Sequence, residues 1–310
     1  LKAFSGGIAS AGKMLLRFTP MIGSLISLGT AANEVFKLFN DGKGVMSLFE
    51  SASAKAARNL EKLSEIIIDL HEIDNTEIII SDNSSTDDTF EIVKEICEKF
   101  NSVNIFLLQQ KSNIGLEQNA LQVLKEATGE YVMYLGDDDY IHKDYLKTVL
   151  TEVKINKGLG LILPSKRTID PSGKIIGGGR DLKRESKKFP KGFKNCLING
   201  WRGHQLSGVV LKRLNLYDKY IESGVNNIYP FIFFTSIRAL EYETFHFTRY
   251  PVLVTEVDQS KKDWGYGNDG LINEIFDNYN KLPLNYIQVT ILQLHQIARQ
   301  DWRIYMFKGI

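Results

Sequence analysis

The sequence predicts an α/β fold with a mostly parallel central sheet. From about residue 43 onward, short apolar segments alternate with amphipathic segments of helical length, and polar turns separate them. Strands that alternate with helices in this way are joined by crossover connections, which make neighbouring strands parallel. The clearest predicted strands are residues 77–81, 104–109, 131–135 and 159–164, and the helices between them are residues 89–100, 116–127 and 143–156.

Further elements follow the same reasoning before and after this region. Residues 45–50 fit a first strand, and residues 53–70 fit a helix with its leucines on one face. Residues 168–176 fit a hairpin around a Pro-Ser-Gly turn. A strand at 207–212, a helix at 226–240 and two pairing strands at 245–247 and 252–255 complete the expected sheet domain.

The two ends of the chain differ from this central region. Residues 1–42 are rich in Gly, Ala, Ser and Leu with helical spacing, and residues 256–310 read as a helical appendage. We therefore expect three parts, at 1–42, 43–255 and 256–310. The most apolar stretch, residues 14–32, is interrupted by Arg17, Pro20, Gly23 and Gly29, so we predict peripheral membrane or partner contact there and no spanning helix.

Composition narrows the class of protein. The 310 residues include 38 Lys and Arg against 37 Asp and Glu, a net charge of +1, so no bulk positive field gathers polyanions and we expect no nucleic-acid partner. The hydrophobic share of 43% is that of a folded globular protein. The two cysteines, Cys97 and Cys196, form neither a metal-ligand spacing nor a disulfide framework, which favours a reducing, cytoplasmic location.

Three adjacent carboxylates, Asp137, Asp138 and Asp139, follow the predicted strand at 131–135. Like charges this close repel one another unless a cation or hydrogen-bond donors offset them. Mg²⁺ and Mn²⁺ prefer oxygen ligands and leave places open for phosphates, so a divalent cation fits this turn. The alternative is a group of helix caps before Ile141, which suits Asp139 best.

A second polar turn, residues 81–89, follows the strand at 77–81 and brings Asp82 to a strand end. Ligands of open α/β sheets bind outside the carboxyl ends of the strands. The Asp82 turn and the Asp137 turn should therefore converge on one crevice. The alternative for the Asp82 turn is an ordinary strand-to-helix connection.

Four motifs in this order resemble the family 2 glycosyltransferases of the GT-A fold: residues 81–89, 112–119, 127–132 and 135–139. The resemblance is strong over about 77–150, fair to about 255 and absent from 1–42. It implies a GT-A-like Rossmann-type sandwich fold. It also implies that the donor is a nucleoside-diphosphate sugar, with a UDP-sugar as the first candidate, and that the configuration at the sugar carbon is inverted. The implied acceptor is a glycan or a lipid-linked molecule. The same resemblance implies a role in the synthesis of a surface polysaccharide or glycoconjugate. This synthesis would take place at the inner membrane face if residues 1–42 contact that membrane.

The resemblance also assigns residues to roles. Asp82, with its neighbour Asn83, matches the turn that recognises the nucleotide base. Asn113 and Gly115 match the loop that closes on the nucleotide. Asp137 falls near the ribose. Asp138 is the first candidate for the Mn²⁺ or Mg²⁺ ligand, and Asp139 is the second.

Three positions depart from the family pattern. The usual Pro-Thr-Tyr-Asn-like turn after the first strand is absent, Gln118 stands where an arginine is common, and residues 227–231 replace the usual Glu-Asp pair that supplies the general base. The acceptor hydroxyl still has to lose its proton, so His204 and Glu222 become the candidate bases. These departures leave open a non-catalytic relative that binds a nucleotide sugar or glycan.

The stretch from Arg180 to Lys194 carries seven Lys and Arg against two acids and follows three glycines. Two readings stand side by side. One is a solvated loop, and the other is a mobile flap that faces a phosphate group or the acceptor.

Overall fold

The computed structural model describes residues 13–18, 76–86, 88–100, 104–136, 139–170, 173–256 and 270–303. The expected strand at 45–50, the expected helix at 53–70 and most of the segment 1–42 lie outside these residues. Asp137 and Asp138 also lie outside them.

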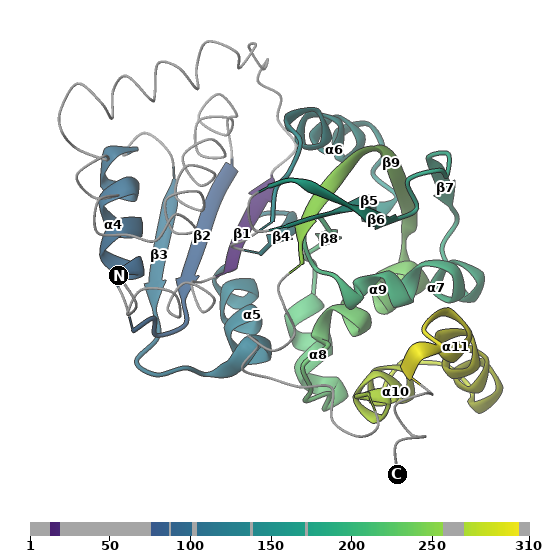
Figure 1. Cartoon of the computed structure of the whole chain (residues 1–310). Helices are drawn as coiled ribbons and strands as arrows, with labels where there is room; N and C mark the ends of the chain where they lie inside the picture. Colours follow the sequence, from purple (N-terminus) through teal and green to yellow (C-terminus); the bar gives the residue numbers. More distant parts are fainter. Residues whose placement is uncertain are drawn as a thin grey trace.

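One mixed sheet forms the centre of the molecule (Figure 1). Its strand order is β3-β2-β1-β4-β8-β5-β9-β7, and β6 pairs with β5 outside this path. Strands β2, β3, β4, β5 and β9 run in one direction, while β1, β6, β7 and β8 run in the other. The strands are β1 (Lys13–Phe18), β2 (Thr76–Asp82), β3 (Ile105–Gln109), β4 (Tyr131–Leu135), β5 (Leu159–Ile169), β6 (Ile175–Arg180), β7 (Lys187–Phe189), β8 (Val210–Lys212) and β9 (Glu243–Thr255).

Strand β1 corrects the prediction of helix for residues 13–18. It lies between β2 and β4 and pairs antiparallel with both. A backbone between two strands satisfies N–H and C=O groups on both of its sides, and such central strands are often continuously apolar. A short apolar run fits a buried strand as well as a helix, and sequence periodicity does not separate the two.

Helices cover both faces of the sheet (Figure 1). Helices α4 (Thr89–Lys99) and α6 (Lys143–Ile155) pack on one face, through a cluster that includes Ile78, Ile80 and Met133. The other face carries α5 (Gly115–Glu126), α8 (Leu216–Ser223), α9 (Pro230–Glu241), α10 (Ile272–Asn280) and α11 (Tyr286–Arg299), around Ile79 and Tyr134. Successive strand residues point to opposite faces, so β2, β4 and β5 each contribute to both clusters.

Two elements near the end of the sheet differ from expectation. The segments 245–247 and 252–255 do not pair with each other, because both belong to the single long strand β9. The parallel neighbour β5 has 11 residues against 13 in β9 and pairs with it from Leu159 to Ile169, with two register shifts. Helix α8 and the short strand β7 had no clear pattern in the sequence.

The C-terminal helices share the core of the sheet domain. Ile275 and Tyr279 of α10 and Leu292 of α11 belong to the same buried cluster as Phe234 of α9. The division into three parts stays a prediction. Among the described residues, no helix is long and apolar enough to cross a membrane.

Candidate functional site

The strands β2, β3 and β4 end at one edge of the sheet. Ser81 in β2 and Leu135 in β4 pair with consecutive residues of β1, and Gln109 in β3 pairs with Asp82. Because these three strands share a direction, their carboxyl ends and the turns that follow them lie together. This is the edge where open α/β sheets hold their ligands.

Asp82 is the last residue of β2 and is only 3% exposed. Its carboxylate accepts hydrogen bonds from the backbone N–H of Ser85, at 3.2 Å, and from the Ser85 hydroxyl. The carboxylate thus closes its own turn, as Asp side chains commonly do. The turn holds the Asp82 side chain at the strand end named in the sequence prediction.

Asn83 joins the turn after β2 to the start of α5. Its Nδ2 donates to Asn113 Oδ1 at 2.9 Å, and its Oδ1 accepts from the backbone N–H of Ile114 at 2.9 Å. The Gly115 N–H also donates to Asn113 Oδ1, at 2.9 Å. Three residues predicted separately, Asn83, Asn113 and Gly115, therefore form one hydrogen-bonded unit.

Gly115 has a positive φ of +78°, and a Cβ placed there would meet no atom within 4 Å. The backbone conformation, and not lack of space, therefore requires glycine at this position. It allows α5 to begin with its N-terminus at the sheet edge, where unpaired backbone N–H groups suit an anion.

Ser81 and Asn119 connect the same strand end to the body of α5. The Ser81 hydroxyl donates to Asn119 Oδ1 at 2.6 Å, and Gln110 Nε2 donates to the Ser81 hydroxyl at 3.2 Å. Ser81 and Asn119 are buried, so this contact fixes the helix against the sheet. No role was predicted for Asn119, although its position one turn into the helix that follows the Asn113 loop could have indicated one.

Ser207 holds both described flanks of the acidic turn after β4. The backbone N–H of Gly136 donates to Ser207 Oγ at 2.9 Å, and Ser207 Oγ donates to Asp139. The other oxygen of Asp139 accepts from the backbone N–H of Thr255 at 2.9 Å. Both oxygens of Asp139 are therefore engaged by the protein.

Asp139 does not cap the helix that follows it. The N-cap of α6 is His142, whose Nδ1 accepts from the backbone N–H of Asp144 at 3.1 Å. The capping alternative is therefore wrong for Asp139, which instead ties the acidic turn to the end of β9. Among the described residues, no group of three or more His, Cys, Asp or Glu is placed to hold a metal ion.

Lys166 of β5 contacts the backbone of Ser207, the residue that holds the acidic turn. It is 2% exposed, and its Nζ donates to the backbone oxygens of Ser207, at 2.6 Å, and Gln205, at 3.2 Å. Burial and the charge of Arg180 lower the pKa of Lys166 well below its usual value, while Asp139 opposes that shift. Lys166 thus links the acidic turn to Arg180 on the neighbouring strand.

The two candidate bases occupy different surroundings. His204 ends the 3₁₀ helix η2 (Gly200–His204) and stacks on Tyr229, with ring centroids 5.2 Å apart. Its Nε2 lies 2.8 Å from Arg303 Nη2, which can only donate, so Nε2 is the acceptor in this contact. Glu222 is exposed near the end of α8.

The basic stretch from Arg180 to Lys194 is not one loop. It includes the end of β6, all of β7 and the start of α7 (Phe193–Asn199). Asp181 within it is 6% exposed at its side chain and pairs with Arg202, from a different part of the chain. Asp181 is therefore shielded from solvent, whereas the lysines of the stretch are exposed, as the solvated-loop reading expects. The mobile flap stays a prediction.

The comparisons agree with this geometry. Residues 51–196 match the family model described as Glycosyl transferase family 2. This match confirms the resemblance predicted from the motifs, because residues 51–196 are similar to the glycosyltransferases of this family.

Curated relatives match part of the chain. Chondroitin synthase from Pasteurella multocida (strain Pm70) is 27% identical over 166 residues, covering 54% of this chain and 16% of that protein. A GalNAc(5)-diNAcBac-PP-undecaprenol beta-1,3-glucosyltransferase from Campylobacter jejuni is 29% identical over 126 residues, covering 40% of each protein. The chain therefore spans less than half the length of these relatives.

A solved structure shows the same fold. The S. aureus protein TarS, residues 1–349, in complex with UDP-GlcNAc has a TM-score of 0.57 and 19% identity, covering 78% of this chain and 70% of that chain. The similarity confirms the GT-A-type α/β fold predicted from the sequence.

Proposed function

We propose that this chain transfers a sugar from a nucleoside-diphosphate sugar, a UDP-sugar foremost, to a hydroxyl group of a glycan or lipid-linked acceptor. The sugar carbon is inverted in this reaction. Support comes from the family 2 match and from relatives named as a chondroitin synthase and as a glucosyltransferase of an undecaprenol-linked glycan. The reaction would serve the synthesis of a surface polysaccharide or glycoconjugate.

One observation carries the proposal above all. The Asp82 turn, the loop before α5 and the flanks of the acidic turn meet at one sheet edge, and Asn83 joins the first two by hydrogen bonds to Asn113 and Ile114. In the proposal, Asp82, Asn83, Asn113 and Gly115 bind the nucleotide. Asp137 binds next to the ribose.

The proposal includes a divalent cation, Mn²⁺ or Mg²⁺, with Asp138 as first ligand and Asp139 as second. When bound, such a cation neutralises charge that develops on the leaving diphosphate. Ser207 would keep the turn in place for it, because its hydroxyl bonds to both Gly136 and Asp139.

His204 and Glu222 stay the proposed alternatives for the base that takes the acceptor's proton. His204 precedes Ser207 by three residues and is therefore tied to the same turn, but its Nε2 already accepts from Arg303. A base at His204 would need that contact to open. His204→Gln and Glu222→Gln separate the two, because only loss of the base lowers kcat while nucleotide affinity is kept.

The test is calorimetric titration of UDP, GDP and CDP with and without Mn²⁺, followed by hydrolysis of the matching nucleotide sugar. Asn83→Ala removes the bonds between the two loops and should weaken nucleotide binding about 10-fold, since a net hydrogen bond contributes about 1 kcal/mol. Asn226→Ala is the matched control, because Asn226 is exposed on another part of the surface. Failure of every nucleotide to bind the unaltered chain would refute the proposal.

A non-catalytic relative is the second candidate. The specific observation in its favour is that one candidate base accepts from Arg303 and the other is exposed on α8. Such a protein would bind a nucleotide sugar without cleaving the bond between the sugar and the diphosphate. Donor hydrolysis or transfer above the rate of a boiled sample excludes it.

The proposed location is cytoplasmic, with peripheral contact between residues 1–42 and the inner membrane face. The two free cysteines, Cys97 and Cys196, support a reducing compartment. Flotation with anionic vesicles, compared between the full chain and a variant with Ile22, Leu25 and Ile26 replaced by serine, tests the membrane contact while leaving the sequence of β1 in place.

A further inference from the structure

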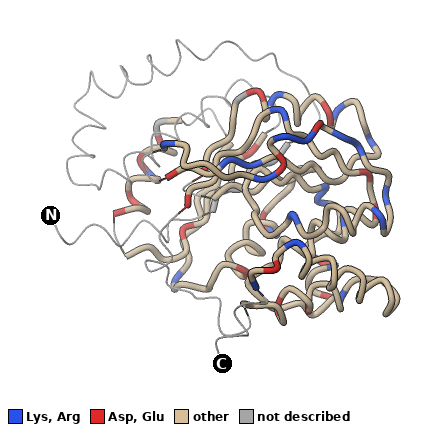
Figure 2. Tube along the Cα trace, turned by 45° about the vertical axis from the view of Figure 1, so that its right-hand side comes forward, with Lys and Arg blue, Asp and Glu red and all other residues tan. Residues whose placement is uncertain are grey.

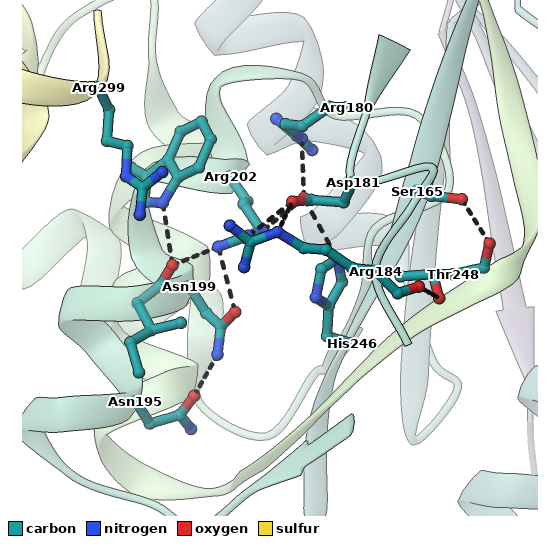
Figure 3. Close-up of polar contacts among 12 residues, drawn as sticks. Ser165, Arg180, Asp181, Arg184, Asn195, Asn199, Arg202, His246, Thr248 and Arg299 are labelled. Atoms are coloured by element: carbon teal, nitrogen blue, oxygen red, sulfur yellow. Dashed lines mark hydrogen bonds and ion pairs between the residues drawn. The ribbon is translucent and has the colours of Figure 1, made fainter. Parts of the chain in front are cut away.

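A group of positive side chains surrounds the carboxylate of Asp181, in the turn after β6 (Figure 3). We call Arg180, Arg184, Arg202 and Arg299 the arginine cluster. They come from the end of β6, the turn after it, the helix η2 and the end of α11, so four separate elements bring their charges together.

Asp181 has more positive neighbours than one carboxylate can neutralise. Arg202 binds it through Nε at 2.9 Å and Nη2 at 3.0 Å, and Arg184 Nε lies 2.9 Å away. Arg180 Nε is 3.8 Å away, too far for a hydrogen bond. His246 Nε2 lies at 3.3 Å, but burial and the charges of Arg202 and Arg180 lower its pKa, so it adds no charge at neutral pH.

Arg180 is the least compensated member of the cluster. Its Nε and Nη2 are buried and have no hydrogen-bond partner among the described residues. Burial and the charge of Arg202 lower the pKa of Arg180 to about 9, so the group is still protonated at neutral pH. Buried guanidinium groups are normally paired, because an unpaired buried charge is costly.

The indole of Trp201 forms a wall of the same place. The guanidinium carbons of Arg202, Arg180 and Arg299 lie 4.8, 5.4 and 5.8 Å from its ring centroid. Cations are attracted to an aromatic face at these distances, so the ring holds three arginines near one another despite their repulsion. A flat aromatic face also suits the apolar face of a sugar ring.

A cleft of about 560 Å³ opens beside the cluster. Arg184 of the cluster lines the cleft together with Asp181, and the rest of the lining includes Arg167, Lys183 and the glycines 177–179. Arg167 Nε is a further buried nitrogen without a hydrogen-bond partner among the described residues. Figure 2 shows Lys and Arg gathered on the side of the molecule that carries β5, β6 and β7.

The arginine cluster and the Asp82 turn lie on opposite sides of the acidic turn in the order of the strands. Arg180 pairs in register with Lys166, Lys166 Nζ donates to the Ser207 oxygen, and Ser207 Oγ donates to Asp139. The contacts of Lys166 therefore connect the strand that carries Arg180 to the acidic turn. The Asp82 turn approaches that turn from β2, on the other side of β4.

We propose that the arginine cluster, with Trp201 beside it, binds a phosphate or carboxylate group carried by the acceptor. An oxyanion would satisfy the open nitrogens of Arg180 and offset the excess positive charge, and guanidinium groups bind both kinds of oxyanion with matched geometry. The inference rests on the proposed function, since it names the acceptor of that reaction as anionic.

The test titrates inorganic phosphate and, separately, glucuronate into the full chain and follows tryptophan fluorescence, with and without saturating UDP. Arg180→Gln and Arg299→Gln should each weaken binding of at least one anion about 10-fold or more, as expected for a lost charge-assisted hydrogen bond or ion pair. Arg299 is exposed, so its variant keeps the fold even if the Arg180 variant does not. Arg249→Gln, at an exposed arginine of β9, is the matched control.

Trp201→Phe should remove most of the fluorescence response, because Trp201 touches the cluster. Binding should persist when UDP is present, and the stronger of the two anions identifies a phosphate-bearing or a carboxylate-bearing acceptor. Displacement of the anion by UDP would assign the cluster to the donor diphosphate and overturn the inference. The inference would also be overturned if both arginine variants bound the anions as tightly as the unaltered chain does, or if the unaltered chain bound neither anion. Failure of the proposed function appears separately, as absent UDP binding.

Discussion

Replacing Asp181 by asparagine should destabilise the protein strongly, because it removes the one carboxylate that the arginine cluster surrounds. Asp181→Asn keeps the size of the side chain and removes its charge. Arg202, whose side chain is 2% exposed, would lose a two-point ion pair and stay buried next to Arg180. Burial alone raises the pKa of Asp181, but its contacts with His246 and Arg202 hold the pKa well below the usual value, so the carboxylate is charged at neutral pH.

The expected loss in the free energy of unfolding is about 3–5 kcal/mol, the typical cost of removing one partner from a buried ion pair. The Arg184 contact adds little to this figure, because the Arg184 side chain is 51% exposed and water screens the pair. For 310 residues the entropy of unfolding is about 0.65 kcal/mol/K, so the melting midpoint should fall by about 5–8 °C.

Urea unfolding and thermal melting of the full chain measure this effect. Asp301→Asn is the matched control, since Asp301 is exposed and its replacement should change the stability by less than about 0.5 kcal/mol. A loss of less than 1 kcal/mol in Asp181→Asn would show that the carboxylate does not offset the buried charge of Arg202. The argument for an anion at the cluster would then lose its electrostatic basis as well.

Three further predictions concern the sheet edge and its surroundings. Gly115→Ala should cost about 1–2 kcal/mol of stability from the positive φ alone and should weaken UDP binding in calorimetry; an unchanged melting midpoint would contradict the assigned backbone conformation. Asp138→Asn should lower Mn²⁺-dependent UDP binding by about 10²-fold with equal or slightly higher stability, whereas Asp139→Asn should mainly lower stability, by about 2 kcal/mol, because Asp139 accepts from Ser207 and Thr255. The reverse pattern would place the metal ligand one residue later. Finally, burial lowers the pKa of His246 in the folded protein, so the unfolded chain binds more protons below about pH 6.5 and stability should fall as the pH drops from 7 to 5.5. His246→Gln should flatten this slope in urea titrations at both pH values, and an unchanged slope would mean that His246 titrates alike in both states.

The sequence alone was sufficient for the central elements of the fold and for placing the Asp82 and Asn113 turns at one sheet edge. The strands at 76–82, 105–109 and 131–135 and the helices between them agree with the predicted ranges to within about a residue. Local patterns predict such elements well, because β2 and β4 are buried on both faces and each helix carries one apolar face. Shared strand direction then brings the turns of Asp82 and Asn113 to one edge without further information.

Long-range contacts settled the rest of the fold. Residues 13–18 form a strand because β2 and β4 leave a gap with open hydrogen-bonding groups on both sides, and no local pattern reports that gap. The segments at 245–247 and 252–255 form one strand because β5 is long enough to pair with both. In each case the partner lies tens of residues away, and a partner at that distance leaves no periodic signal.

The arginine cluster shows most clearly what only the tertiary structure decided. The sequence established that residues 180–194 are basic and follow three glycines, which is typical of an exposed loop. The fold brings Arg202 and His246 to Asp181 and Arg299 to Trp201 from other elements. It also buries two nitrogens of Arg180 that find no hydrogen-bond partner in the described part of the chain. The energy of a charge depends on its burial and on its neighbours in space, so a local run of residue types predicts the charge but not its surroundings.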